Sequence, residues 1–334
     1  MHSDTKSYHE RYMRVALRLA RGQAGRTYPN PNVGAVIVKN NQIIAHGVTA
    51  DGGRPHAETI AIKEAGKEVI GASLYVTLEP CSHHGKTPPC AEAIIKAGIK
   101  EVVISCRDKN PQVSGGGVKM LKDVGIEVVE GICEAEGQEI VRGFFSVIEK
   151  KRPFIALKIA TSLDGKITHP AGRWITGKAA RDYGHLLRAR YDAILTGSGT
   201  VIVDDPLLTC RLAGLEHHSP LRVILDRGKR VPKSAKLLND GKESWVISRE
   251  LPEAIAEITE RGITSILVEA GAKLSTAFLA SGMVDVVYWF RAPIIIGDGG
   301  LSAMEPLSAL VKFKEIEHIK LGSDSLDILE CLPE

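Results

Sequence analysis

Segments of strand-like and helix-like pattern alternate along the first half of the chain. Apolar residues recur at helical spacing from 13 to 20, just before Gly22, which predicts a helix that ends there. Further along, short apolar runs alternate with other helical repeats. The predicted strands are 33–38, 43–45, 74–78, 102–104 and 127–129, and the later predicted helices are 56–65, 91–97, 118–123 and 134–147. This alternation is typical of a three-layer α/β domain.

The second half opens with a strand of unusual pattern. In residues 154–160 apolar side chains alternate along one face, and Lys158 and Ala160 share the other face. A charged residue in the middle of a strand indicates that this face of the strand does not simply pack in a hydrophobic core. Later elements are predicted as a helix at 178–190 and strands at 193–195, 222–225, 244–247, 266–269 and 285–290.

The chain is too long for a single hydrophobic core to be expected, since it has 334 residues. The charged segment 149–153, which ends in a proline, is predicted to link two domains. We expect these domains to span residues 1–149 and 150–334.

Composition and charge exclude several classes of protein. The net charge of +3 is too small to indicate nucleic-acid binding. The N-terminus lacks the apolar stretch of a signal peptide, and the longest apolar run, 284–296, is broken by charged residues and a proline, so no membrane span is expected. Six unevenly spaced cysteines do not form a disulfide framework, which favours the cytoplasm.

Residues 55–90 contain the most specific chemical pattern. His56, Cys81 and Cys90 supply one imidazole and two thiols, and three protein ligands are typical of a catalytic zinc site with its fourth position open. Glu58 stands where zinc-dependent nucleobase deaminases have their acid/base, in a His-x-Glu motif followed by Pro-Cys elements. Here eight residues separate the two cysteines instead of two, and the polar insert could contact a substrate.

The zinc pattern leaves other interpretations open. A closed structural zinc site or two ordinary buried cysteines would not need Glu58. A zinc-stabilised binding protein without catalysis is a further alternative. An RNA or DNA base deaminase would share the site, but the aromatic content of 5% and the weak net charge argue against a nucleic-acid groove.

The second half carries a weaker signal for a phosphorylated ligand. The turn 269–274 joins a strand to a helix, and free backbone N–H groups at such a helix start suit a pyrophosphate. No Gly-x-Gly-x-x-Gly follows a strand, so the dinucleotide-binding fingerprint is absent.

Several motifs together resemble the bifunctional deaminase/reductase family of riboflavin biosynthesis. In the first half they are PNPNVG at 29–34, PHAE at 55–58 and TLEPCSHHGKTPPC at 77–90. In the second half they are SLDG at 162–165, WITG at 174–177, LRA at 187–189, DAIL at 192–195, TV at 200–201, DDPLLT at 204–209 and VEAG at 268–271. They occur in order over nearly the whole chain.

The resemblance implies a fold and two consecutive reactions. The first domain would be a cytidine-deaminase-like three-layer α/β/α domain, and the second a dihydrofolate-reductase-like α/β domain. The deaminase would remove the ring amine of diaminohydroxyphosphoribosylaminopyrimidine. The reductase would then convert the ribosyl group to ribityl with NADPH, which explains a nicotinamide site without the usual fingerprint. We also expect a homo-oligomer that acts on phosphorylated pyrimidines and binds neither nucleic acid nor membrane.

The resemblance also assigns roles to residues. Zinc would be bound by His56, Cys81 and Cys90, with Glu58 as the catalytic acid/base, and the first substrate would be contacted by Asn30, His83 and Lys86. The positions that match NADPH contacts are Ala160, Trp174, Thr200, Asp204, Gly271, Ala272, Lys273, Leu274, Ser275, Thr276 and Ala277. The positions that match contacts to the second substrate are Lys158, Arg188, Leu208, Arg211 and Glu269. The chain departs from the family at Thr49 and Gly172, where the family has His and Ser. The alternative is a single-activity zinc nucleobase or nucleic-acid deaminase with a non-catalytic ligand-binding domain.

Overall fold

The chain folds as two compact units, residues 1–152 and 153–334, each with its own sheet. The structure is a computed structural model that describes residues 3–85, 88–111, 113–169 and 174–332. None of the helices in these ranges is long and apolar enough to span a membrane.

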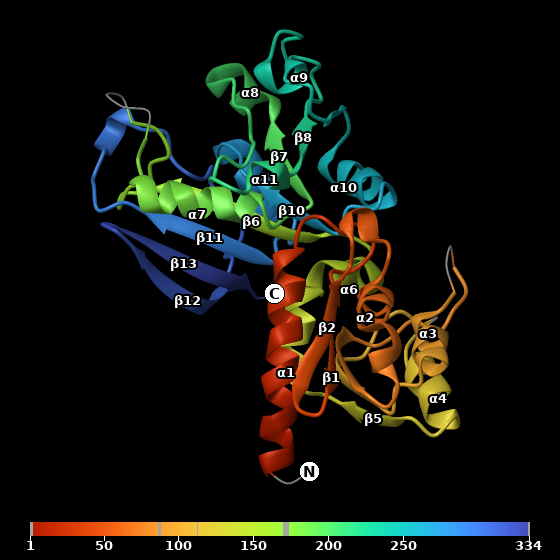
Figure 1. The fold of residues 1–334 in the computed structure, drawn as a ribbon. Helices are drawn as coiled ribbons and strands as arrows, with labels where there is room; N and C mark the ends of the chain where they lie inside the picture. The colour runs from red at the N-terminus through yellow and green to blue at the C-terminus, as the bar shows by residue number, and fades with distance from the viewer. Residues whose placement is uncertain (1–2, 86–87, 112, 170–173, 333–334) are drawn as a thin grey trace. The chain divides into compact units, whose positions relative to one another are not determined.

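Unit 1 is built on a five-stranded sheet in the order β2-β1-β3-β4-β5 (Figure 1). β1 runs antiparallel to β2 and β3, whereas β3, β4 and β5 are parallel. The strands are β1 (Gly34–Lys39), β2 (Gln42–Val48), β3 (Ser73–Leu78), β4 (Glu101–Cys106) and β5 (Glu127–Glu130). The helices are α1 (Ser3–Gly22), α2 (Ala57–Ala65), α3 (Cys90–Ala97), α4 (Gly116–Asp123), α5 (Glu134–Ile140) and α6 (Arg142–Lys150), with short 3₁₀ turns at Asp51–Gly53 and Gly66–Val69.

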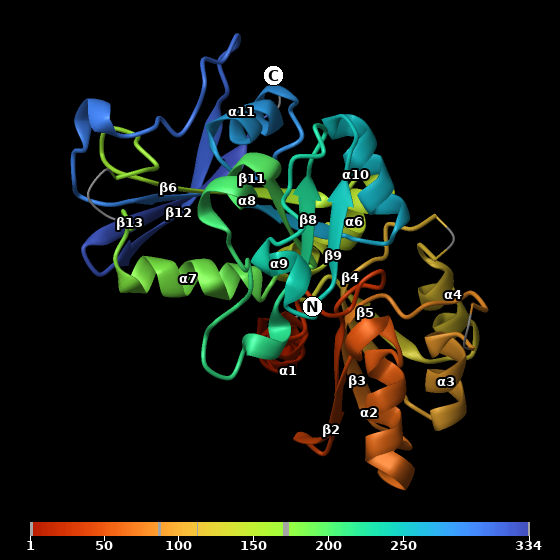
Figure 2. The ribbon, with the colours of Figure 1, turned by 90° about the horizontal axis from the view of Figure 1, so that it is seen from above.

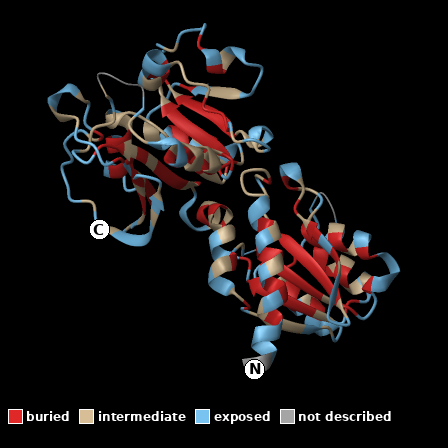
Figure 3. Ribbon diagram, turned by 60° about the vertical axis from the view of Figure 1, so that its left-hand side comes forward, coloured by how far each residue is buried: buried red, intermediate tan, exposed pale blue. Residues whose placement is uncertain are grey.

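Helices cover both faces of this sheet. On one face Met13 and Leu17 of α1 join a buried cluster with side chains of β1, β3 and β4. On the other face Ala61, Ile94 and Leu121 place α2, α3 and α4 in a second cluster. The strands β1, β3 and β4 between these layers are largely buried, and the outer faces of the helices are exposed (Figure 3). The predicted three-layer domain is confirmed.

The start of α2 is fixed by a close approach to β2. A Cβ atom on Gly47 would stand only 2.2 Å from the carbonyl oxygen of Ala57, so a larger residue would push the helix away. His56 stands directly before α2, and Glu58 lies in its first turn. The contact between α2 and β2 therefore sets where these two residues lie relative to the sheet.

Unit 2 contains an eight-stranded sheet in the order β12-β13-β11-β6-β10-β7-β8-β9 (Figures 1 and 2). The six strands β11, β6, β10, β7, β8 and β9 are parallel to one another. β13 pairs antiparallel with β11, and β12 pairs antiparallel with β13 at the edge of the sheet. The strands are β6 (Phe154–Thr161), β7 (Ala193–Gly197), β8 (Leu221–Leu225), β9 (Ser244–Ile247), β10 (Ser265–Val268), β11 (Val286–Arg291), β12 (Phe313–Leu321) and β13 (Asp324–Cys331). The helices are α7 (Lys178–Arg188), α8 (Ser198–Asp204), α9 (Lys236–Asn239), α10 (Leu251–Glu260) and α11 (Ala272–Ala280), with 3₁₀ turns at Glu216–His218 and Gly297–Gly299.

The register of β6 and β10 places two charged residues side by side. Leu157 of β6 lies opposite Val268, the last residue of β10. The next residues along these two parallel strands are Lys158 and Glu269, which therefore meet at the carboxyl end of β10. Ligands bind at this edge in open α/β sheets.

Candidate functional sites

The three predicted metal ligands converge in unit 1. Their ligand atoms lie within 4.8 Å of one another, and among the described residues this is the one such group of three or more His, Cys, Asp or Glu side chains. His56 Nδ1 is 3.3 Å from Cys90 Sγ and 3.8 Å from Cys81 Sγ. One imidazole and two sulfurs fit zinc and leave the fourth tetrahedral position for another ligand.

Element boundaries hold these ligands in place. His56 is the N-cap of α2, in extended backbone geometry, and Cys90 is the first residue of α3. Cys81 follows the end of β3, and its sulfur accepts a hydrogen bond from the Cys90 backbone N–H at 3.2 Å. Hydrogen bonds from the Cys90 thiol and His56 lower the pKa of Cys81 to about 4, although burial opposes this. Cys81 is therefore favoured as a thiolate, which is the form that binds metal, whereas the hydrogen bond to Cys81 and burial raise the pKa of Cys90.

Glu58 lies beside the metal ligands and is almost fully buried, with 4% of its surface exposed. Burial raises the pKa of this carboxyl, while His56 lowers it, and the side chain is hydrogen bonded to Cys90. A carboxyl group with a raised pKa next to an open metal position is suited to accept a proton and return it.

The sequence interpretation missed Glu79, which anchors the loop that carries Cys81. Glu79 is 3% exposed, and its carboxylate accepts hydrogen bonds from four backbone N–H groups. The donors are Asp108 at 3.3 Å, Gly115 at 3.1 Å, Gly117 at 3.1 Å and Val118 at 3.2 Å. The one feature of the sequence that could have indicated this role is the position of Glu79, an acidic residue between the buried strand β3 and the metal ligand Cys81.

The other residues discussed for the first site differ in where they lie in the structure. Asn30 donates a hydrogen bond to the Gly53 carbonyl at 2.8 Å and so supports the segment that leads to His56. His83 is exposed on the loop after Cys81. Lys86 and Gly172 lie outside the described residues. Thr49, which departs from the family pattern, is buried, and its hydroxyl accepts a hydrogen bond from the Val33 N–H at 3.0 Å.

Unit 2 contains a basic cavity of about 290 Å³ at the edge where Lys158 and Glu269 meet. It brings together the predicted residues Lys158, Trp174, Arg188, Arg211 and Glu269. The ring of Trp174 is half exposed and stacks with the guanidinium of Arg181, whose carbon lies 5.2 Å from the ring centre.

Glu269 is the centre of an ion-pair network in this cavity. Arg188 donates from Nε to Oε1 at 2.7 Å and from Nη2 to Oε2 at 2.9 Å, and Lys158 Nζ lies 3.6 Å from Oε2. Burial alone would raise the pKa of Glu269, but the charges of Arg188 and Lys158 lower it to about 2. Arg188, which the helical pattern alone would leave on a solvated face, thus has a buried acidic partner.

Most of the predicted cofactor positions lie on α8 and α11 or at the start of α11. A Cβ on Gly271, the N-cap of α11, would be 4.0 Å from Thr200 Oγ1, and one on Gly197 would be 3.3 Å from Leu274. Ser275 and Thr276 are buried and form internal hydrogen bonds. The remaining cofactor positions are Ala160 and Ala272, which are partly exposed, and Asp204, Lys273 and Ala277, which are exposed. Leu208, on the substrate side, is buried with a positive φ of 55°.

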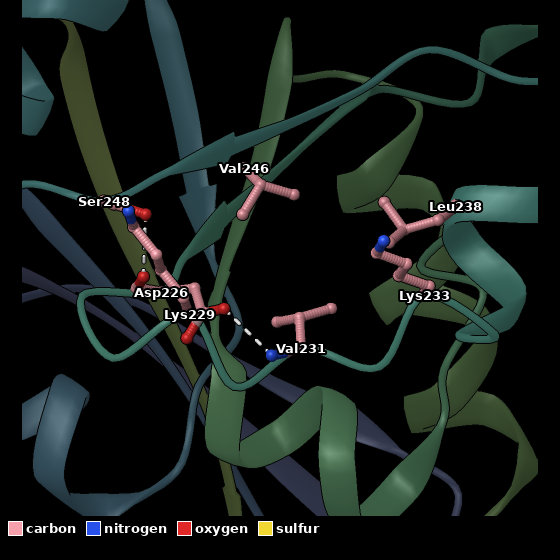
Figure 4. A pocket seen from close by; sticks show the side chains of 7 residues that line it. All are labelled: Asp226, Lys229, Val231, Lys233, Leu238, Val246 and Ser248. Carbon is pink, nitrogen blue, oxygen red and sulfur yellow. Dashed lines mark hydrogen bonds between the residues drawn. The ribbon is translucent and has the colours of Figure 1, made fainter.

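A second cavity, of about 200 Å³, lies at the carboxyl ends of β8 and β9 (Figure 4). Asp226, which follows β8, accepts hydrogen bonds from the N–H groups of Arg230 and Val231 at 2.9 Å each. Ser248, which follows β9, donates to the Asp226 carbonyl at 2.9 Å. The sequence pattern identified none of these residues, because no motif marks them.

Comparison with known proteins shows two family matches. The RibD C-terminal domain matches residues 153–326, and the cytidine and deoxycytidylate deaminase zinc-binding region matches residues 6–106. The riboflavin biosynthesis protein RibD of Aquifex aeolicus is 42% identical, over 94% of this chain and 96% of that protein. The chain belongs to the RibD family. RibD of Escherichia coli is 39% identical, over 93% of this chain and 96% of that protein.

Solved RibD structures share the fold over almost the whole chain. The Thermotoga maritima diaminohydroxyphosphoribosylaminopyrimidine deaminase/5-amino-6-(5-phosphoribosylamino)uracil reductase has a TM-score of 0.89 and 39% identity, and covers 98% of this chain and 100% of that one. Acinetobacter baumannii RibD also has a TM-score of 0.89, with 38% identity and the same coverage. The expected family, its two-domain fold and its use of zinc and NADPH are confirmed. This RibD-family chain is a bifunctional deaminase and reductase of riboflavin biosynthesis.

Proposed function

We propose that residues 1–149 deaminate diaminohydroxyphosphoribosylaminopyrimidine and that residues 150–334 reduce the resulting phosphoribosylaminouracil to its ribityl form. The observation that carries this proposal is the convergence of His56, Cys81 and Cys90 beside the buried Glu58. The similarity to the Thermotoga maritima deaminase/reductase, which is named for these two substrates, supports their choice.

In the deaminase step, His56, Cys81 and Cys90 would hold zinc. When bound, zinc lowers the pKa of a water molecule from about 15.7 to about 7. Glu58 would take a proton from the attacking water and deliver it to the departing ammonia, since its raised pKa suits both transfers. Asn30, His83 and Lys86 would contact the pyrimidine substrate.

In the reductase step, the basic cavity would hold the phosphoribosyl substrate. NADPH supplies the hydride. Arg211 and Arg188 would contact the substrate phosphate, with Lys158, Leu208 and Glu269 on the same side. NADPH would lie along Ala160, Trp174, Thr200, Asp204 and residues 271–277. Glu269 stays ionised at neutral pH, because its pKa is about 2, so it would orient Arg188 and Lys158 rather than donate a proton.

Product analysis tests the proposal directly. The purified protein is incubated with the diaminopyrimidine substrate, first without and then with NADPH. We expect ammonia and the aminouracil in the first reaction, and the ribityl product with NADPH oxidation in the second. Absence of the deaminated product with zinc present would contradict the assignment of unit 1.

A second prediction is that the two activities separate when the chain is cut near Lys150. The N-terminal piece should bind zinc and the C-terminal piece should bind NADPH, because each unit has its own sheet and core. Metal analysis and fluorescence titration with NADPH measure the two properties. A loss of NADPH affinity that is restored only by adding the N-terminal piece would contradict this division.

We also propose that the enzyme is a cytoplasmic homo-oligomer that binds neither nucleic acid nor membrane. All six cysteines are free, which fits a reducing compartment. Sedimentation analysis of the full chain measures the assembly.

A further inference from the structure

Helix α7 presents a row of basic residues to the cavity of unit 2. Lys178, Arg181, His185 and Arg188 follow one another at spacings of three and four residues, so they lie on one face of the helix, and all four line the cavity. Of these four, only Arg188 has a role in the proposed function. His185 stands between Arg181 and Arg188, about one helical turn from each.

The charge of Arg188 is already balanced within the protein. Its Nε and Nη2 donate to Glu269, and its Nη1 donates to the Thr209 carbonyl at 3.1 Å. A phosphate monoester carries about 1.5 to 2 negative charges at neutral pH and three acceptor oxygens. A substrate phosphate beside Arg188 therefore needs further donors. Arg211 and His185 both line the cavity, and they are close enough for the charge of Arg211 to act on the His185 ring.

The ring of His185 has one nitrogen inside the protein. Its Nδ1 is buried and has no hydrogen-bond partner among the residues that the structure describes. Because His185 is only partly buried and lines the cavity, Nε2 is the nitrogen that can meet a ligand there. A phosphate oxygen at this position would give the ring a strong acceptor.

The protein's own groups keep His185 neutral at the pH of an ordinary assay. Burial and the charges of Arg188 and Arg211 lower the pKa of the ring to about 4, and the charge of Glu269 opposes them only in part. An anion beside the ring would favour the imidazolium and so raise this pKa. The other charged residues that line the cavity, on β6 and α7, are Lys158, Lys178, Arg181 and Asp182.

We propose that His185 is a further substrate-binding residue of the reductase site, which takes up a proton as its ring meets the substrate phosphate beside Arg188 and Arg211. The proton comes from the solvent and returns to it when the product leaves. The imidazolium donates a charge-assisted hydrogen bond, which is stronger than one from a neutral ring. This inference rests on the proposed placement of the phosphoribosyl group in the basic cavity.

The test measures proton uptake on binding. The full chain is titrated calorimetrically with phosphoribosylaminouracil, without NADPH, in two buffers of different ionisation enthalpy at about pH 6, just below the ordinary pKa of His. His185→Gln keeps a polar side chain that cannot be protonated. His217→Gln is the matched control, because His217 is exposed on the 3₁₀ turn Glu216–His218. Proton exchange by the substrate's own phosphate is common to all three proteins and cancels in the comparison.

We expect the wild type and His217→Gln to take up roughly one more proton per bound substrate than His185→Gln does. The reductase KM of His185→Gln for this substrate should be raised roughly 10-fold or more at about pH 6. The difference should shrink as the pH rises, because the imidazolium is then lost from the complex. NADPH affinity and deamination should stay unchanged, which also shows that both units are folded.

Equal proton uptake by the wild type and His185→Gln would overturn the inference. So would a KM that His185→Gln raises by the same factor at every pH, since that indicates a neutral contact or a change in the shape of the cavity. If the wild-type chain does not bind phosphoribosylaminouracil at all, the proposed function of unit 2 fails, and this inference fails with it.

Discussion

Glu58→Gln should abolish deamination while leaving zinc bound. The variant keeps the size of the side chain but cannot carry a proton, so the loss should be at least the roughly 10²–10⁴-fold typical of a positioned acid/base. His56, Cys81 and Cys90 are unchanged, so metal analysis should give the wild-type zinc content. The deaminase assay then measures the proton-transfer role alone.

The same protein supplies the control for correct folding. Reduction of the aminouracil by unit 2 should continue at the wild-type rate, because the two units have separate cores. Glu64→Gln is a matched control, since Glu64 is a half-exposed acid on the same helix as Glu58. Wild-type deamination by Glu58→Gln would contradict the role of Glu58, and loss of zinc would make it a residue that supports the metal site.

The metal site could be predicted from the sequence because its chemistry is local. His56 and Cys90 stand at helix starts that proline residues mark in the sequence, and Glu58 is two residues from a ligand. Glu79 was missed because its partners are backbone N–H groups of residues 108–118, which carry no sequence signal.

Long-range pairing limited what could be predicted in unit 2. Arg188 and Glu269 are 81 residues apart, and the packing of α7 against the sheet brings them together, whereas the register of β6 with β10 places Lys158 beside Glu269. The strands β12 and β13 were not predicted. β12 is mostly exposed, and a bulge between Glu315 and Glu317 interrupts its period of two.

Helix boundaries in unit 1 show a similar limit. The apolar pattern predicts one helix over 134–147, but two helices, α5 and α6, meet at Val141. Val141 is buried, and its backbone angles, φ −98° and ψ 13°, are not those of a helix. Tertiary packing therefore ends α5 at Val141, although its apolar side chain fits the helical pattern of the sequence.

Arg188→Ala should damage both the stability of unit 2 and its reductase activity. The sequence alone predicts only a higher KM for the phosphorylated substrate. In the structure, the variant leaves the Glu269 carboxylate, which is 12% exposed, with Lys158 at 3.6 Å as its remaining cation. Removing one partner of a buried ion pair typically costs about 3–5 kcal/mol. Arg190→Ala is the control, because Arg190 is exposed just beyond the end of α7.

The double variant Arg188→Ala/Glu269→Gln separates the two effects. Neutralising Glu269 removes the unpaired charge, so the double variant should recover much of the unfolding free energy that Arg188→Ala loses. The reductase KM for the phosphorylated substrate should remain raised, by roughly 10- to 150-fold for a lost charge-assisted contact worth about 1.5–3 kcal/mol. Denaturant unfolding of the C-terminal piece and steady-state kinetics of the full chain measure the two quantities, with deamination unchanged in every variant. Recovery of both stability and KM in the double variant would show that Arg188 acts only through Glu269 and does not contact the substrate.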